Sequence, residues 1–295
     1  MSRTSHLTTI DDPDSVITPI DSAIRFPEIL SDLHDKYHDD IALFREMIAT
    51  SDSSGELLAR IRSRDIQSQT RMSLLKMFRR CVAPVLDTEK TKKITVVSTD
   101  SLVANYGATF KPISKLKSQF EDPGDETLSA LAALIGEYDT RGQQGYQLTE
   151  TFFDWFDAAF DGQMKIDGPR RAGRDIELSA IFPDFEGNYP CDFIISSASG
   201  DVVCVGFARY DSTRGGAQSD DRTGGNAYKV AKAQEFYRNS GRKFRLLFVS
   251  DGPGLTHRDT WAEACQLDDA WDGNVRVATL KLAPERVTQC WLLSG

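Results

Sequence analysis

The sequence predicts an α/β protein whose first half is mainly helical. Three observations support this prediction. Apolar residues recur at steps of three and four before residue 160, β-branched and aromatic runs follow residue 174, and a helical stretch separates two of those runs. The order of strand, hairpin, helix and strand is typical of a sheet covered by helices on both faces.

Composition indicates an ordinary globular protein. Of 295 residues, 40% are hydrophobic and 27% are charged, with 21 Gly and 11 Pro, which excludes collagen-like, wholly disordered and disulfide-scaffold proteins. No apolar run approaches the ~20 residues of a membrane span, and the first residues lack the apolar stretch of a signal peptide. We therefore expect a cytoplasmic protein without a membrane partner.

Three regions are predicted along the chain. Residues 1–24 are polar and aperiodic, which indicates a flexible arm. Residues 25–145 form a mainly helical region that opens with an amphipathic helix, and residues 146–295 hold the sheet. The expected helices cover residues 26–48, 57–66, 72–82, 126–138, 149–160 and 227–239, and the expected strands cover 176–182, 191–196, 202–210, 244–250 and 275–280.

The five cysteines form no C-x-x-C pair and stand among apolar residues, so we interpret them as small buried thiols rather than bridges or zinc ligands. His34 and His38 have helical i,i+4 spacing. They lack the Glu of a zinc-binding H-E-x-x-H motif and have acidic neighbours, which indicates a solvated helix face.

Charge is distributed unevenly. The net charge is −9, yet residues 60–93 carry ten Lys and Arg against three acids, a local charge of +7 that leaves −16 for the rest. Such a segment can present a basic groove to phosphates, or it can be the basic outer face of a helix. The sequence leaves both interpretations open.

A hairpin is the most informative local pattern. A three-residue loop over 198–200, with Gly200 in the left-handed position, pairs Ser197 with Asp201. Counting outward places Asp192 opposite Gly206, and the side chains at 192, 206 and 208 then share one face. A two-residue loop would put 206 and 208 on the other face.

Residues 149–250, with Pro190-Cys191-Asp192 opening one strand and Gly206-Phe207-Ala208 on the next, resemble the core of the PD-(D/E)XK nucleases, and type II restriction endonucleases in particular. The resemblance implies a mixed central sheet flanked by helices. It also implies that Asp192 and an acid at position 206 hold Mg²⁺, and that a Lys at position 208 helps to activate water. Glu150 is a candidate for the upstream acid that the family sometimes takes from its first helix, against the alternative of a solvated Glu in the first turn of a helix.

The second motif departs from the family, because Gly206 offers no ligand and Ala208 replaces the Lys. The backbone carbonyl of Phe207 is the remaining candidate ligand beside Asp192. Two explanations are open. Gly206 replaces a catalytic Glu in a protein whose active form is toxic, which is the explanation we favour, or the acid has moved elsewhere. The candidates for a moved acid are Glu177, Glu150 and Glu235.

Residues 209–226 contain no apolar run but several side chains of the kind that bind base edges and phosphates. We expect a DNA-binding loop, against the alternative of a mobile surface loop. The candidate DNA-binding residues are Arg209, Arg214, Gln218, Asp220, Arg222, Asn226 and, on the following helix, Lys229.

The resemblance implies a sequence-specific, Mg²⁺-dependent endonuclease acting on double-stranded DNA. We expect a homodimer that matches palindromic sites, with residues 25–145 supplying dimer contacts and part of a DNA clamp. With Gly206 in place, cleavage should be feeble or absent. A DNA-binding protein with a decayed, non-catalytic nuclease core is the alternative, and a small-molecule enzyme with a deep apolar pocket is a third possibility.

Overall fold

Contacts in a computed structural model of the chain divide it into two compact units, residues 23–141 and residues 1–22 with 142–295. The structure describes residues 5–21, 24–137, 139, 143–171, 173–213 and 218–294, and in the helix that begins at Gln218 it describes side chains from residue 225 onward. None of the described helices is long and apolar enough to span a bilayer.

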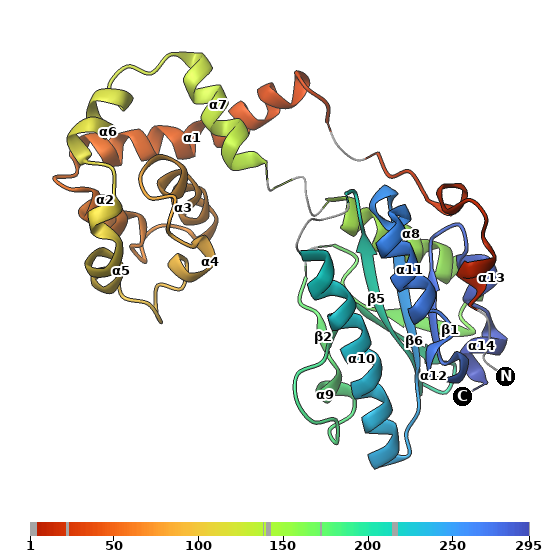
Figure 1. Ribbon diagram of the computed structural model, residues 1–295. Coiled ribbons are helices and arrows are strands. Elements are labelled where there is room, and N and C mark those ends of the chain that lie inside the picture. The colour runs from red at the N-terminus through yellow and green to blue at the C-terminus, as the bar shows by residue number, and fades with distance from the viewer. Residues whose placement is uncertain are drawn as a thin grey trace. The chain divides into compact units, whose positions relative to one another are not determined.

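The unit of residues 23–141 is helical (Figure 1). Helix α1 forms its centre and buries Tyr37, Ile41, Phe44 and Ile48 at steps of three and four residues, so the predicted amphipathic helix is confirmed. The elements of the unit are α1 (Glu28–Thr50), α2 (Ser54–Ile61), α3 (Ser68–Cys81), α4 (Thr88–Thr91), α5 (Thr99–Tyr106), η3 (Gly107–Thr109), α6 (Ile113–Phe120) and α7 (Asp125–Gly136).

Much of the positive charge of residues 60–93 is used within this unit. Arg62 is buried and donates to the backbone carbonyl of Thr91 at 3.0 Å, and burial lowers its pKa. Arg60 and Arg71 also donate to backbone carbonyls, while ion pairs engage Lys76, Arg80 and Lys92. We therefore favour a structural role for the arginines of this segment over a continuous basic groove.

The second unit contains a mixed five-stranded sheet of order β1-β4-β5-β6-β7. Strands β1, β4 and β5 are antiparallel, and β5, β6 and β7 are parallel. The strands are β1 (Met164–Asp167), β4 (Phe193–Ser197), β5 (Val202–Tyr210), β6 (Arg245–Asp251) and β7 (Val275–Ala278), and a separate pair joins β2 (Ile176–Glu177) to β3 (Pro190–Cys191). The predicted α/β class with a mixed sheet is confirmed, but the strand expected over 176–182 ends at Glu177, where a short helix begins.

Helices cover both faces of the sheet. Helix α8 (Gln143–Phe160) packs on one face through Phe152, Phe153, Phe156 and Phe160, which lie in one core cluster with Phe193 and Cys204. The opposite cluster joins Val205 and Phe207 to apolar residues of helices α10 (Gln218–Ser240) and α11 (Arg258–Leu267). The remaining helices are α9 (Leu178–Ile181), α12 (Ala270–Gly273), α13 (Ala283–Arg286) and α14 (Gln289–Leu293).

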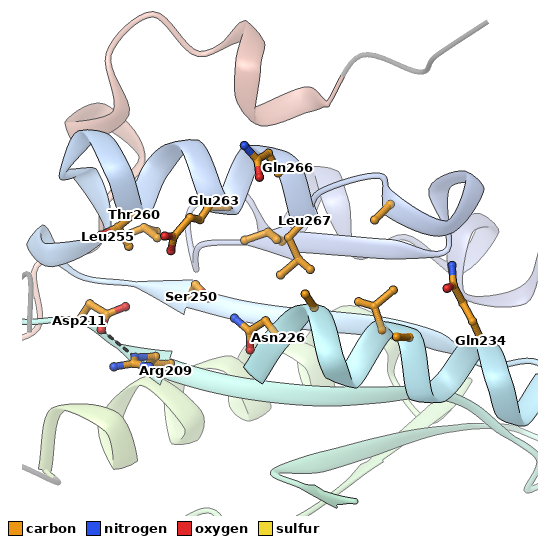
Figure 2. Close-up of a pocket in the computed structure, with 16 residues that line it drawn as sticks. Arg209, Asp211, Asn226, Gln234, Ser250, Leu255, Thr260, Glu263, Gln266 and Leu267 are labelled. Atoms are coloured by element: carbon orange, nitrogen blue, oxygen red, sulfur yellow. Dashed lines mark hydrogen bonds and ion pairs between the residues drawn. The ribbon is translucent and has the colours of Figure 1, made fainter. Parts of the chain in front are cut away.

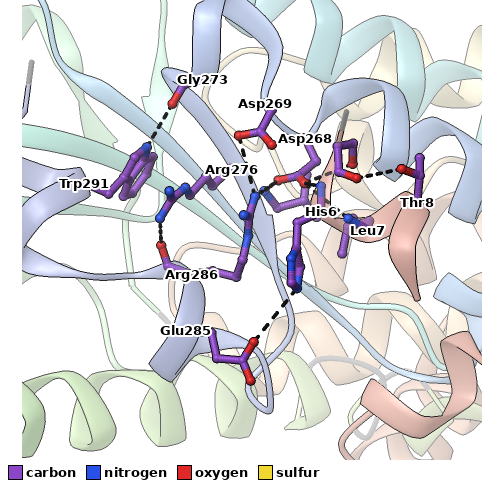
Figure 3. Close-up of polar contacts among 12 residues, drawn as sticks. His6, Leu7, Thr8, Asp268, Asp269, Gly273, Arg276, Glu285, Arg286 and Trp291 are labelled. Atoms are coloured by element: carbon purple, nitrogen blue, oxygen red, sulfur yellow. Dashed lines mark hydrogen bonds and ion pairs between the residues drawn. The ribbon is translucent and has the colours of Figure 1, made fainter. Parts of the chain in front are cut away.

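The N-terminal segment differs from the predicted flexible arm. Two short 3-10 helices, η1 (His6–Thr9) and η2 (Pro13–Val16), pack against the second unit, and Leu7 is buried there. The carboxylate of Asp268 accepts hydrogen bonds from Ser5 Oγ at 3.0 Å and from the His6 N–H at 3.1 Å (Figure 3). The arm prediction was wrong because this anchor depends on one hydroxyl and on backbone donors that meet a distant carboxylate, which composition does not reveal.

A second buried carboxylate extends this anchoring. Asp251 ends strand β6 and accepts the N–H groups of Thr18, Gly252 and Leu280 at 2.8 to 2.9 Å. Since these donors come from three different segments, one side chain joins the N-terminal segment and a C-terminal loop to the end of the central sheet.

Candidate functional site

The hairpin turn has the predicted geometry, but the strands that it joins are shifted in register. Gly200 has φ +89°, and the Ser197 N–H donates to the Asp201 carbonyl at 2.9 Å. Ser196 pairs with Val202, whereas Ile195 pairs with Cys204. Val203 is therefore an extra residue in β5, and this bulge shifts the following pairs by one position.

The shift changes which residues lie beside Asp192. Gly206 pairs with Phe193 instead of Asp192, and Asp192, in the bend before β4, hydrogen-bonds to the backbone of Gly206 and Ala208. Alternate side chains point to opposite faces of a sheet, so Phe207 and Arg209 share the face that α10 covers. Asp192 and Lys229 of α10 shift each other's pKa, which indicates that the Asp192 carboxylate lies near the same face. The predicted grouping of 192, 206 and 208 was wrong.

Gly206 is a packing residue. A Cβ atom at this position would lie 2.0 Å from two ring carbons of Phe193, which is far inside van der Waals contact. A glycine inside a strand often marks such a close approach. A Glu at this position would also point toward α8 and away from Asp192, so the explanation of Gly206 as a replaced catalytic acid is contradicted.

Asp192 lies in the bend between β3 and β4, half-buried, with its carboxylate held in one orientation. Its Oδ2 accepts the backbone N–H of Ala208 at 2.8 Å. Burial raises the pKa of the carboxyl, and the negative charge of Asp175 adds to this, while the Ala208 hydrogen bond and the positive charge of Lys229 oppose it. Ala208 thus acts through its amide and not through a side chain.

Two cations accompany Asp192 on this face. The Lys229 ammonium on α10 lies 3.6 Å from the centroid of the Phe207 ring, and burial lowers its pKa while Asp192 raises it. The positive charge of Arg209 also lowers the pKa of Lys229, which indicates that the two cations are close neighbours. Arg209 is partly exposed and donates through Nε to Asp211 at 2.7 Å.

The backbone of Phe207 is directed away from Asp192. The Gly206 carbonyl accepts from the Asp192 N–H, and the Ala208 N–H donates to the Asp192 side chain. Because backbone groups of successive strand residues point to alternate sides, those of Phe207 point toward β6. The predicted role of the Phe207 carbonyl as a metal ligand was wrong.

None of the moved acids that the sequence suggested completes a metal site with Asp192. Glu150 pairs with Arg171 at 3.3 Å, Glu177 accepts the Tyr189 N–H at 3.3 Å, and Glu235 is exposed on α10. Across the described residues, no group of three His, Cys, Asp or Glu side chains could hold a metal ion. Asp175 is the other described carboxylate whose charge acts on Asp192, and this pair is a poor donor set for Mg²⁺, which favours several oxygen ligands.

The downstream segment also differs from the prediction. Helix α10 begins at Gln218, so Asn226 lies inside the helix and does not cap it. Arg214 lies outside the described residues, and the side chains of Gln218, Asp220 and Arg222 lie outside the part that the structure describes.

A cavity of about 320 Å³ lies between α10 and α11, and sequence reasoning gave no indication of it. Arg209 and Asn226 line this cavity, so it adjoins the face of Asp192 (Figure 2). The one available signal was the set of alanines at 227, 231 and 264, which are too small to fill the space between two helices.

No family model, curated protein or solved structure matches this chain. The PD-(D/E)XK resemblance therefore stays a prediction from motif residues and from the order of elements.

Proposed function

We propose that the second unit binds double-stranded DNA through the face that carries Arg209 and Lys229, and that its core is nuclease-like but not catalytic. The order of elements supports the resemblance. Helix α8 precedes the antiparallel strands β1, β4 and β5, and helix α10 then leads to β6, which is parallel to β5. This is the order that the resemblance to PD-(D/E)XK nucleases implies.

The observation that carries the proposal is the composition of the face beside Asp192. The shifted register puts Phe207 and Arg209 where the family has an acid and a lysine, and Lys229 adds a second cation. Arg209 and Lys229 are two cations beside the carboxylates of Asp192, Asp175 and Asp211, and arginine and lysine are the side chains that most often contact a phosphodiester. Phosphate contacts by Arg and Lys supply most of the affinity in non-specific DNA binding.

The half-buried position of Lys229 suits it to this role. Burial lowers the pKa of its ammonium. A nearby phosphate would favour the charged form, and its attraction to this half-buried lysine would be stronger than its attraction to a fully solvated one. Magnesium-dependent hydrolysis is not part of the proposal, because the described residues bring together no group of three possible metal ligands. We propose a homodimer on palindromic sites as the assembly.

Fluorescence anisotropy of labelled duplex DNA tests the proposal with the full-length chain in EDTA and at about 50 mM salt. The wild-type protein should bind, while Lys229→Ala and Arg209→Ala should each weaken binding about tenfold. Lys165→Ala is the matched control, because Lys165 is an exposed lysine on the far edge strand β1. Absence of wild-type binding, or an equal loss in the control, would contradict the proposal.

A second assay addresses hydrolysis. Supercoiled plasmid incubated with the protein and Mg²⁺ should remain uncut, both for the wild type and for Gly206→Glu. Specific cleavage by the wild-type protein would show that the core is catalytic and that our assignment of a non-catalytic core is incorrect.

A further inference from the structure

The cavity between α10 and α11 results from the residues that the two helices present to each other. Helix α10 contributes residues 227, 230, 231 and 234, and α11 contributes residues 260, 263, 264 and 267, both at i, i+3, i+4 and i+7 spacing. Each stripe includes alanine, so the facing side chains leave about 320 Å³ empty. Small-molecule sites are concave pockets of about this size or larger, so this space is a candidate ligand site.

The volume limits the ligand. A water molecule takes about 30 Å³ of the liquid, so 320 Å³ corresponds to roughly ten waters. A space of this size accommodates a small ring system.

The walls combine an apolar centre with polar groups at the edges. Val230, Leu267 and Val277 are among the apolar residues of the lining. Figure 2 shows the paired Arg209 and Asp211 at one end and Gln234 at the other.

Four polar side chains of the lining are available to a ligand. Asn226, Gln234, Thr260 and Glu263 make no hydrogen bond or ion pair with any residue in the described part of the chain. The amides and the hydroxyl both donate and accept, and the carboxylate accepts. An uncharged ring that carries amino groups and ring nitrogens complements this set, and Asn, Gln and Glu are the side chains that pair with such edges in bases.

Charge argues against an anionic ligand inside the cavity. Asp211 neutralises Arg209 through a contact of 2.7 Å, and Glu263 adds one further negative charge to the lining. A phosphate would be repelled from the interior, yet it would be attracted to Lys229 on the neighbouring face.

We propose that this cavity binds a nucleobase. The inference rests on the proposed function in one respect: a base extruded from DNA would enter the cavity beside the face proposed to bind the backbone phosphates. Extruded bases are held in other proteins by hydrogen bonds to their edges and by apolar or aromatic walls. A free nucleoside offers the same chemistry, so the test needs two arms.

The first arm uses duplexes in which 2-aminopurine replaces each base in turn. The emission of 2-aminopurine rises severalfold when it leaves the stack, and we expect this rise at one position on binding of the wild-type protein. The second arm titrates the four deoxynucleosides by isothermal titration calorimetry in the absence of DNA.

Filling the cavity is the decisive control in both arms. Ala231→Leu and Ala264→Leu should abolish the signal, while Ala262→Leu, on the exposed face of α11, should leave it unchanged. Two filling variants on different helices are used so that a folding defect in one of them does not decide the result.

A signal in either arm that the filling variants remove supports the inference, and the arm identifies the source of the base. No signal in either arm, or a signal that Ala231→Leu and Ala264→Leu retain, overturns it. If duplex DNA binds without a 2-aminopurine response and no deoxynucleoside binds, the nucleobase site is wrong while the proposed function stands. If no DNA binds but a deoxynucleoside does, the proposed function fails and the cavity assignment holds.

Discussion

The ring of Phe193 occupies the space in which a side chain at position 206 would lie. Two of its carbons are 2.0 Å from the site of a Cβ atom on Gly206, and the two residues are direct partners across β4 and β5. The glycine thus leaves room for an aromatic ring against the central strand, and the strand needs no turn at this position.

We expect Gly206→Ala to lower the free energy of unfolding by about 1–3 kcal/mol, because the added methyl group forces the ring from its place. Urea unfolding followed by tryptophan fluorescence measures this unit alone, since the four tryptophans lie at 155, 261, 271 and 291. Gly145→Ala on α8 is the control, as its added Cβ meets no atom within 4 Å. Phe193→Leu in the Gly206→Ala background should recover part of the loss, and equal effects at 145 and 206 would argue against the ring contact.

The buried carboxylate of Asp192 predicts a pH-dependent stability. Because burial raises its pKa above the unfolded value, folding favours the protonated form. Ionisation of Asp192 therefore lowers the free energy of unfolding at pH values above the folded pKa. This loss disappears as the pH falls below the unfolded pKa. Asp192→Asn, which keeps an acceptor for the Ala208 amide, should raise the free energy of unfolding at pH 8 relative to wild type, and the gain should shrink toward pH 4.

Urea midpoints at several pH values measure this difference, with the exposed Glu186→Gln as the control. A gain that is constant with pH would assign the effect to packing rather than to ionisation.

Asp268 connects the N-terminal segment to the second unit. It is fully buried and contacts Arg286 at 2.5 Å, so Asp268→Ala leaves a buried guanidinium without this carboxylate. We expect a loss of about 3–5 kcal/mol in the free energy of unfolding. Limited proteolysis should also cleave residues 5–20 faster in the variant, and unchanged cleavage would show that this segment is held by other contacts.

Cysteine reactivity should follow burial. Cys290 is exposed, whereas Cys191 and Cys204 are buried, and burial raises the pKa of Cys191 to about 12. Alkylation of the native protein with iodoacetamide, followed by mass spectrometry, should modify Cys290 first and leave Cys191 intact. Rapid modification of Cys191 would place it at an accessible surface.

The fold was predictable where long patterns repeat. The phenylalanines of α8 recur at helical spacing, and the apolar runs that became β4, β5 and β6 are bounded by turn residues. The loop at Gly200 was predictable as well, because a left-handed residue in a three-residue hairpin favours glycine.

The site was less predictable, because it depends on one extra residue. Val203 has the β propensity of any strand valine, so the sequence carries no signal that it forms a bulge. The bulge nevertheless moves Gly206 to the α8 face and brings Phe207 and Arg209 next to Asp192. The N-terminal segment was misjudged for a related reason, since Asp268 binds backbone groups, whose positions do not depend on side-chain composition.

The central claim is that Arg209 and Lys229 contact DNA phosphates, and the salt dependence of binding tests it most directly. The slope of log K against log salt concentration counts the phosphate contacts, so each alanine variant should reduce it by about one unit, while Lys165→Ala should not change it. The account would be contradicted if the Arg209 and Lys229 variants kept the slope of the wild-type protein, or if the wild-type protein bound no DNA at low salt.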